Sequence, residues 1–205
     1  MRKKQLEMLL SLKYGNADQV RWMHHWHLLQ RILLLDIPGS VVEIGCNTGL
    51  TACFMQVAME RKRELHVYDS FEGMPHRTSE DDGTWGWVQS GVLAVSEQSV
   101  LDTFAKWDEP PPVIHKGWFR NTLHDQLPDQ IAYAHLDGDL YESIKVSLEK
   151  TYPRLPAGAV CVVDDWAMDM MPGCKKACAD FFQDKPEVVR WLFGSVQGYF
   201  IKGAP

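Results

Sequence analysis

The sequence contains no long hydrophobic run and no excess of positive charge. Since no stretch of about 18 consecutive apolar residues occurs, we expect no membrane span. The formal net charge is −6 and no long basic run offsets it, which argues against nucleic acid or an anionic membrane as a partner. The apolar part of the N-terminal segment is too short for a secretory signal. With 45% hydrophobic and 23% charged residues, the chain is predicted to fold rather than to be disordered.

Cysteine is scarce and shows none of the spacings that are typical of disulfide or zinc frameworks. The five cysteines lie at positions 46, 53, 161, 174 and 178, and no C-x-x-C pair occurs. We therefore expect reduced thiols and a cytoplasmic location. Cys174 and Cys178 are one helical turn apart, but two isolated thiols rarely hold a metal.

Short apolar runs alternate with helical stretches along most of the chain. The predicted strands are 41–44, 65–68, 113–115, 131–136 and 159–163. The predicted helices are 50–63, 97–107, 141–152 and 173–184. This alternation predicts an α/β fold with a parallel sheet. Two late runs, 188–192 and 197–201, are so close in sequence that they can pair only as an antiparallel hairpin, which we expect at one edge of the sheet.

An amphipathic helix is expected before the first strand, over about residues 18–35. Its apolar stripe consists of Trp22, Trp26, Leu29 and Leu33. The stripe predicts packing on the core, although a helix in this place could also cover a pocket. We therefore divide the chain into an N-terminal helical segment, 1–36, which is a possible lid, and a main domain, 37–205. The histidines of this helix, at 24, 25 and 27, have no apparent third metal ligand and are expected to be packed or solvent-facing.

Acidic residues stand at or near the carboxyl ends of four predicted parallel strands. They are Glu43, Asp69, Asp137 and the pair Asp164-Asp165. Such strand ends meet at one edge of a parallel sheet, where ligands bind in folds of this kind. Carboxylates gathered there repel one another unless cations or ligand hydroxyl groups pair with them. One such acid could be a helix cap, but four strands with the same ending predict a binding site.

The loop after the first strand predicts close approach to a ligand. It contains Gly45 and Gly49, which let the backbone turn tightly. It lacks the G-x-G-x-x-G pattern of nicotinamide and flavin binders, because Asn47 and Leu50 occupy two of the glycine positions. Asp69 follows at the end of the second strand, where an acid can accept hydrogen bonds from ribose hydroxyls. The combination favours an adenosine-containing ligand without a pyrophosphate cradle, a description that S-adenosylmethionine fits.

A second acidic group points to a cation. If the last two parallel strands are neighbours, Asp137 lies close to Asp164 and Asp165. Three carboxylates without histidine or cysteine form an oxygen site suited to Mg²⁺ or a similar divalent ion. Asp139 has two interpretations, since it could act as a base, or it could open a capping box with Glu142 at the start of the next helix.

Several long blocks together resemble the macrocin O-methyltransferase (TylF/MycF-type) family of S-adenosylmethionine-dependent enzymes. The blocks are DSFEGMP at 69–75, GWFRNTL at 117–123 and LDGDLYES at 136–143, with further similarity at 37–45, 158–165 and 173–181. Together they span about residues 37–201, most of the chain. The glycine loop alone would prove little.

The resemblance implies a class I methyltransferase fold of Rossmann-like type, with a mostly parallel seven-stranded sheet, an antiparallel last strand and helices on both faces. It implies methyl transfer to a hydroxyl of a small molecule, usually a sugar or natural-product scaffold. It places the S-adenosylmethionine site at Glu43, Ile44, Gly45, Cys46, Asn47, Asp69, Ser70, Phe71, Glu72, Gly73, Phe119, Asp137, Gly138 and Ser143. It places a divalent metal at Asp137, Asp164 and Asp165, with Asp139 as the catalytic base.

Some positions depart from the family pattern. The loop reads Cys46-Asn47-Thr48, and Trp166 follows the aspartate pair; both changes are expected to touch the pocket. Leu140 stands where a catechol methyltransferase would have lysine, which makes a catechol acceptor less favoured. Two alternatives remain open: a non-catalytic methyltransferase-like binding subunit and, less favoured, a nicotinamide-dependent oxidoreductase. A homo-oligomer is also possible.

Overall fold

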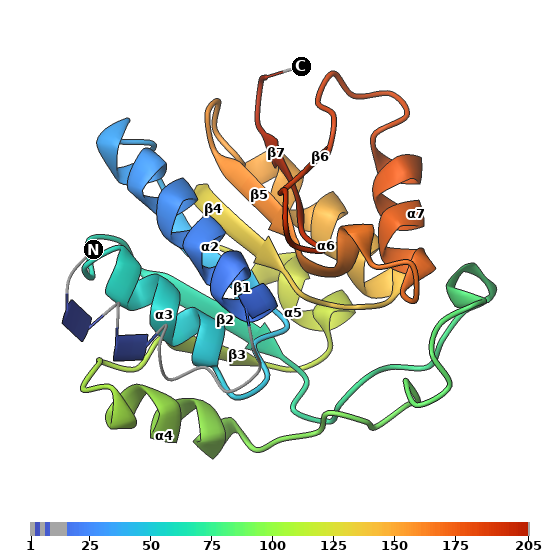
Figure 1. The fold of residues 1–205 in the computed structure, drawn as a ribbon, viewed down its shortest axis with the longest axis horizontal. Helices are drawn as coiled ribbons and strands as arrows, with labels where there is room; N and C mark the ends of the chain where they lie inside the picture. Colours follow the sequence, from blue (N-terminus) through green and yellow to red (C-terminus); the bar gives the residue numbers. More distant parts are fainter. Residues whose placement is uncertain (1–2, 5–6, 9–15, 205) are drawn as a thin grey trace.

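The seven strands of the computed structural model form a single sheet (Figure 1), and the residues that the structure describes are 3–4, 7–8 and 16–204. The strands are β1 (Ser40–Ile44), β2 (Leu65–Asp69), β3 (Val113–Lys116), β4 (Ile131–Leu136), β5 (Val160–Val163), β6 (Arg190–Trp191) and β7 (Gly198–Ile201). Their order is β3-β2-β1-β4-β5-β7-β6. Neighbours among β1 to β5 are parallel, whereas β7 is antiparallel to both β5 and β6. The predicted mostly parallel sheet with its antiparallel last strand is confirmed, as is the late hairpin at one edge.

Helices connect the strands and cover both faces of the sheet (Figure 1). The α-helices with described bounds are α2 (Asn16–Leu34), α3 (Leu50–Ala58), α4 (Glu97–Lys106), α5 (Phe119–Asp125), α6 (Tyr141–Thr151) and α7 (Pro172–Phe181). Short 3-10 helices are η1 (Ser79–Asp81), η2 (Tyr152–Arg154) and η3 (Asp164–Ala167). No helix in the described ranges is long and apolar enough to cross a membrane.

One predicted helix ends earlier than expected, and one observed helix was not predicted. The helix expected over 50–63 ends at Ala58, because Glu60 and Arg61 adopt the left-handed φ values of 57° and 60°. Helix α5 was not predicted at all. It is 7 residues long and begins after Trp118, which provides no side-chain cap, so the sequence carries no start signal there.

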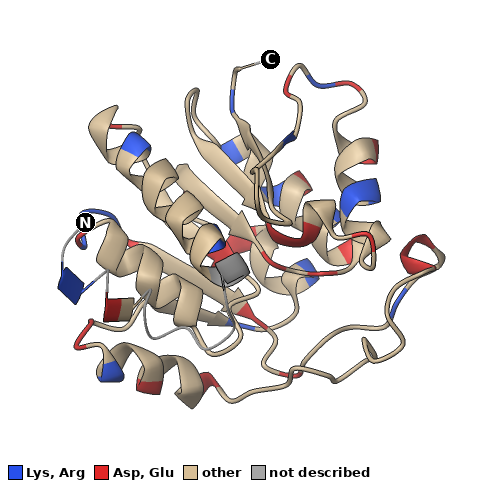
Figure 2. Cartoon of the chain, viewed as in Figure 1, with Lys and Arg blue, Asp and Glu red and all other residues tan. Residues whose placement is uncertain are grey.

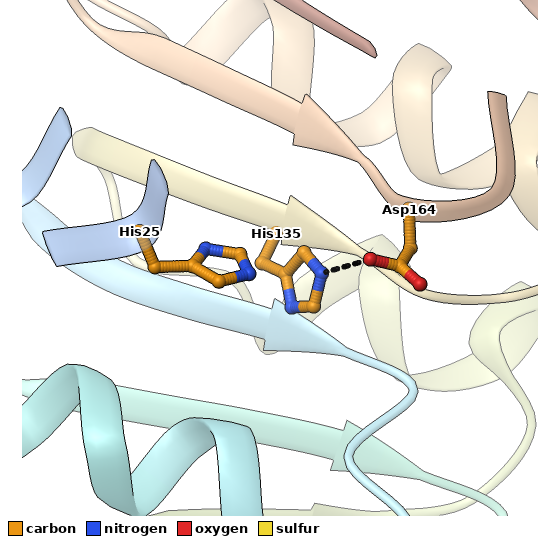
Figure 3. Close-up of side chains that lie close together, drawn as sticks. All are labelled: His25, His135 and Asp164. Atoms are coloured by element: carbon orange, nitrogen blue, oxygen red, sulfur yellow. Dashed lines mark hydrogen bonds and ion pairs between the residues drawn. The ribbon is translucent and has the colours of Figure 1, made fainter. Parts of the chain in front are cut away.

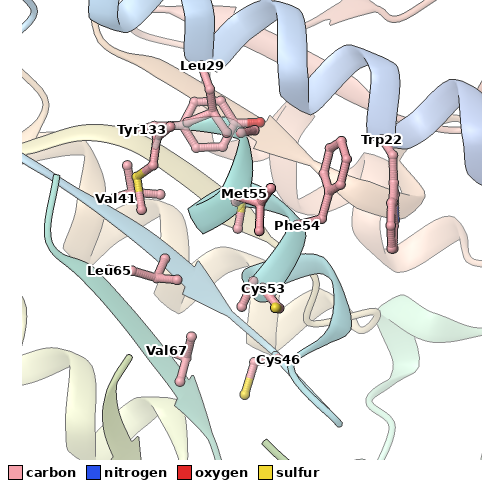
Figure 4. Close-up of a cluster of buried hydrophobic side chains, with 14 of the residues drawn as sticks. Trp22, Leu29, Val41, Cys46, Cys53, Phe54, Met55, Leu65, Val67 and Tyr133 are labelled. Carbon is pink, nitrogen blue, oxygen red and sulfur yellow. The ribbon is translucent and has the colours of Figure 1, made fainter. Parts of the chain in front are cut away.

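Successive side chains along each strand point to opposite faces of the sheet, so they pack into two separate cores. Val41 and Val67 face the core beneath α2 and α3, where Trp22 stacks on Phe54 with ring centroids 4.6 Å apart (Figure 4). Val42 and its neighbours on that side face α5, α6 and α7. The stripe predicted for α2 packs as expected, with Trp22 and Leu29 buried and Trp26 and Leu33 partly buried against the same core.

Candidate active site

A pocket of about 870 Å³ lies at the carboxyl ends of the parallel strands, within the range typical of small-molecule sites. Figure 2 shows acidic segments gathered near these strand ends, in the middle of the molecule. Nine of the residues expected to bind cofactor line the pocket: Gly45, Asn47, Asp69, Ser70, Gly73, Phe119, Asp137, Gly138 and Ser143. So do Asp139, Asp164 and Asp165.

The remaining residues expected at the cofactor do not line the pocket. The side chains of Ile44, Cys46 and Phe71 are buried in the two cores. Glu43 is buried, with 1% of its surface exposed, and Glu72 is exposed to solvent. The side chains that the structure brings to the pocket from this set are therefore mostly small or acidic.

The end of β1 is pressed against the end of β4. Gly45 has a φ of 92°, and a Cβ atom there would lie 2.0 Å from the carbonyl oxygen of Asp137. Only glycine permits this approach, which places Gly45 next to Asp137 in the lining of the pocket. Beside it, Asp69 accepts hydrogen bonds from the backbone N–H of Asn47 and that of Phe71, each 2.8 Å long. Each oxygen of Asp69 accepts one of these hydrogen bonds. Because a carboxylate can accept about four in total, Asp69 can accept further hydrogen bonds from a ligand.

Asp137, Asp164 and Asp165 meet as the strand order predicts, since β4 and β5 are neighbours. Each offers an oxygen within 4.8 Å of the other two. Burial and then the charge of Asp164 raise the pKa of Asp137 well above its ordinary value, and the same causes raise the pKa of Asp165. Burial would also raise the pKa of Asp164, but the hydrogen bond from His135 and the charge of Arg21 outweigh burial and lower this pKa. One of the three is thus held as an anion by protein cations.

This donor set fits a divalent cation. It consists of carboxylate oxygens, the ligands that Mg²⁺ prefers. The guanidinium of Arg21, from α2, already lies on it: Nη1 is 2.9 Å from Asp164 Oδ2, and Nη2 is 3.6 Å from Asp165 Oδ1. The cluster therefore accommodates positive charge at the place where a metal was expected.

The capping-box interpretation of Asp139 is wrong. The N-cap of α6 is Leu140, which makes no side-chain cap hydrogen bond, and Asp139 has a φ of 61°. The Tyr141 N–H donates instead to Asp81 Oδ1, 2.8 Å away, from the loop between β2 and α4. Asp139 shares a hydrogen bond with Asp165, and its pKa is raised well above the ordinary value, first by burial and then by the charge of Asp137.

A buried polar network supports the acidic cluster on the α2 side of the sheet. Glu43 and His135 are register partners on β1 and β4. His135 Nδ1 lies 2.9 Å from Glu43 Oε1, and Nε2 lies 3.5 Å from Asp164 Oδ1 (Figure 3). Burial alone would lower the pKa of His135, but Asp164 and Glu43 outweigh it and raise the pKa to about 10. His135 is therefore charged at neutral pH and bridges the two carboxylates.

Helix α2 adds a neutral histidine to this network. His25 lies beside His135, with ring centroids 4.4 Å apart (Figure 3). Its Nε2 is 3.1 Å from Gln197 Nε2, which also donates to Asp164 Oδ1 over 2.7 Å. Because an amide nitrogen only donates, His25 Nε2 accepts, and Nδ1 carries the proton toward Tyr133 Oη at 2.6 Å. Burial and the charge of His135 lower the pKa of His25, in agreement with the neutral ring.

His25, His135 and Asp164 are close enough together to bind a metal, but their atoms are already engaged. All four ring nitrogens have protein partners. We therefore interpret this group as a hydrogen-bond network and not as a second metal centre.

Four residues at the site were not predicted from the sequence: Arg21, His135, Gln197 and Asp81. A signal existed for His135: it is a polar residue inside an otherwise apolar strand, two positions before Asp137, and Glu43 occupies the matching place in β1. Polar residues facing each other inside a buried sheet usually pair. No local pattern connects Arg21 or Asp81 with partners 143 and 60 residues away.

Trp166 does not line the pocket, contrary to expectation. Its ring packs on β7, where a Cβ atom at Gly198 would lie 2.7 Å from it. The expected thiols are present, since all five cysteines are free and buried.

The model of the macrocin-O-methyltransferase (TylF) family matches residues 12–190. The chain belongs to this family. The resemblance inferred from the sequence blocks is thus confirmed.

Curated relatives of the TylF family member are themselves O-methyltransferases by name. One is 8-demethyl-8-(2,3-dimethoxy-alpha-L-rhamnosyl)-tetracenomycin-C 4'-O-methyltransferase of Streptomyces olivaceus, 32% identical over 165 residues that cover 76% of this chain and 62% of the relative. Another is demethyldecarbamoylnovobiocin O-methyltransferase of Streptomyces niveus, 33% identical over 161 residues that cover 71% and 59%. The chain thus spans about three fifths of the length of these relatives.

Solved structures agree on the fold. The O-methyltransferase NovP superposes with a TM-score of 0.79 at 27% identity, covering 90% of this chain and 80% of NovP. The calicheamicin methyltransferase CalS11 gives a TM-score of 0.75 at 20% identity, covering 98% and 91%. The class I methyltransferase architecture of this TylF family member is established by these matches.

Proposed function

We propose that the protein is a cytoplasmic S-adenosylmethionine-dependent O-methyltransferase that uses a divalent cation to methylate a hydroxyl group on a sugar or another natural-product scaffold. Family membership supports the reaction type. The named activities of the relatives, on tetracenomycin and novobiocin intermediates, support the class of acceptor.

The observation that carries this proposal is the joining of two half-sites in one pocket. Asp69, with the Gly45 loop, forms one half, and Asp137, Asp139, Asp164 and Asp165 form the other. The first half would hold the methyl donor and the second would hold the cation and the acceptor hydroxyl. Methyl transfer requires the acceptor oxygen to lie in line behind the methyl carbon, so a single pocket with both halves suits the reaction.

Each group has a defined task in this proposal. Asp69 accepts hydrogen bonds from the ribose hydroxyls, while its own bonds to the Asn47 and Phe71 N–H groups hold it in place. Asp137, Asp164 and Asp165 would hold the cation, which when bound orients an acceptor hydroxyl and lowers its pKa. Asp139 takes the proton, and its raised pKa makes it a stronger base than an ordinary carboxylate.

The proposal is tested by incubating the protein with S-adenosylmethionine labelled with tritium in its methyl group and a panel of glycosides and nucleotide sugars. Label should appear in an acceptor and be lost when that hydroxyl is absent. Excess chelator should stop transfer, and Mg²⁺ should restore it. Full transfer in chelator would contradict the role of the cation while leaving the methyltransferase intact.

Calorimetric titration with S-adenosylmethionine separates the remaining alternatives. Binding of S-adenosylmethionine without transfer to any acceptor would favour a non-catalytic binding subunit. Binding of a nicotinamide cofactor instead would favour an oxidoreductase.

A further inference from the structure

Arg21, on α2, contacts the acidic cluster directly. Its guanidinium lies 2.9 Å from Asp164 Oδ2 and 3.6 Å from Asp165 Oδ1. The arginine side chain is 26% exposed, whereas those of Asp164 and Asp165 are 6% and 10% exposed. Arg21 thus reaches two buried carboxylates from the pocket wall, where it is one of the lining residues.

The hydrogen bonds of Asp164 leave little choice of oxygen for a cation. Oδ1 is turned inward, where Gln197 donates to it over 2.7 Å and His135 lies 3.5 Å away. Oδ2 is the atom that Arg21 binds. A cation that coordinates Asp164 from the pocket must therefore use the oxygen that now holds the guanidinium.

We infer that Arg21 and a divalent cation are alternative occupants of the same carboxylates, so that Arg21 acts as a built-in counter-ion which the cation displaces. This inference rests on the proposed cation site. It follows from the shared oxygen and from charge, because a guanidinium on Asp164 and Asp165 both blocks ligand atoms and repels a second cation. The guanidinium stands at the end of a long side chain that is partly exposed.

The test is direct titration with Mn²⁺, followed by electron paramagnetic resonance of the free ion, without acceptor or S-adenosylmethionine. Arg21→Met keeps the length of the side chain and removes its charge. It should bind Mn²⁺ about tenfold more tightly than the wild type, the scale of one charge-assisted hydrogen bond. Arg21→Gln should shift the affinity in the same direction and provides a second variant if Arg21→Met folds poorly.

Arg31→Met is the matched control. It removes the same charge from the same helix, but Arg31 donates to the Gly158 carbonyl oxygen and not to the cluster. Ten residues along a helix correspond to roughly 15 Å, which exceeds the screening length of about 8 Å at physiological salt. Its affinity for Mn²⁺ should stay near that of the wild type.

Thermal melting gives a second readout. In chelator, Arg21→Met should melt below the wild type, because its carboxylates have lost their counter-ion. Saturating Mg²⁺ should raise the melting temperature of the variant by more than it raises that of the wild type. The reason is that tighter binding to the folded state increases its stability further.

Equal or weaker Mn²⁺ binding by folded Arg21→Met and Arg21→Gln would overturn the inference while leaving the proposed function standing. Absence of binding in the wild type and both variants would overturn it together with the cation site. Binding that appears only in the variants would support it. Absence of methyl transfer by the wild type, with the Mn²⁺ difference intact, would count against the proposed function alone.

Discussion

Asp69 and Asp139 are both carboxylates near strand ends, but their hydrogen-bond partners differ. Each oxygen of Asp69 accepts one backbone N–H, which fixes the side chain as an acceptor. Asp139 instead forms a hydrogen bond with Asp165 among other acids, and burial followed by the charge of Asp137 raises its pKa. These surroundings support the roles proposed for Asp69 in binding ribose hydroxyls and for Asp139 in proton transfer.

Replacement of Asp69 by alanine should weaken the binding of S-adenosylmethionine by about tenfold to a hundredfold. A hydrogen bond to a charged acceptor contributes roughly 1.5–3 kcal/mol, and each 1.4 kcal/mol is about tenfold in affinity. Isothermal calorimetry measures the change. Asp102→Ala, which removes the same charge from α4, should bind like the wild type. A folded Asp69→Ala with unchanged affinity would exclude the ribose role.

Replacement of Asp139 by asparagine should reduce the turnover number by about 10²–10⁴, the usual cost of losing a general base. Since Asp139 does not cap α6, the melting temperature and the affinity for S-adenosylmethionine should change little. Single-turnover transfer of the labelled methyl group measures the rate. A variant that retained activity within a few-fold would show that the proton goes elsewhere.

At the scale of elements, the loop between β2 and α4 is fixed to the body of the protein by Asp81. Its Oδ1 accepts from the Tyr141 N–H at the start of α6, and its Oδ2 accepts from the N–H and the hydroxyl of Thr78. A Cβ atom at Gly173, in α7, would lie 2.0 Å from the same Oδ1. One buried carboxylate therefore joins η1, α6 and α7, and the loop segment it holds contributes to the pocket wall.

Asp81→Ala should destabilise the protein by about 1–2 kcal/mol, the scale of a lost helix cap, and should expose the loop to protease. Gly173→Ala should have the same effect by pushing Asp81 away. Urea denaturation measures the first effect, and limited proteolysis with mass spectrometry locates cuts within 70–96. Asp82→Ala, at the exposed neighbouring position, should resemble the wild type. Resistance to protease in Asp81→Ala would show that other contacts hold the loop.

Across the whole molecule, Glu109 connects three parts of the chain that are distant in sequence. It follows α4 and binds both Lys4, in the N-terminal segment, and Arg61, after α3. Burial would raise the pKa of Glu109, but the bonds from Arg61 and Lys4 outweigh it and lower the pKa below the ordinary value of 4.5.

Glu109→Gln should therefore lower the melting temperature at pH 7 by about 2–4 °C. Because the folded pKa is depressed, the contribution of Glu109 is complete above about pH 4.5 and is lost as the pH falls through the folded pKa. The wild-type and variant melting curves should consequently converge in acid. Calorimetry from pH 7 to pH 3 measures this, and a constant difference over that range would contradict the ionic interpretation.

The sequence was sufficient for the sheet and for the meeting of Asp137 with Asp164 and Asp165, because both depend on strand alternation and on neighbouring strands. It was not sufficient for the partners of those acids. Arg21 reaches the cluster from a helix whose periodicity indicated only its apolar stripe. Asp139 matched a capping pattern by spacing, yet this residue has a left-handed φ and its carboxylate forms a hydrogen bond with Asp165. Contacts between distant segments decided both outcomes.

The position of β7 sets an order of events during synthesis. β6 is made before β7, yet β6 pairs only with β7, which lies between it and β5. Until β7 pairs with it, the outer edge of β5 has no partner strand, and unpaired edges attract other chains. Gln197, immediately before β7, completes the hydrogen bonds of Asp164. The hydrogen bonds of Asp164 are therefore complete only when β7 is in place, and a chain truncated before residue 197 would lack both the antiparallel partner of β5 and this donor to the acidic cluster.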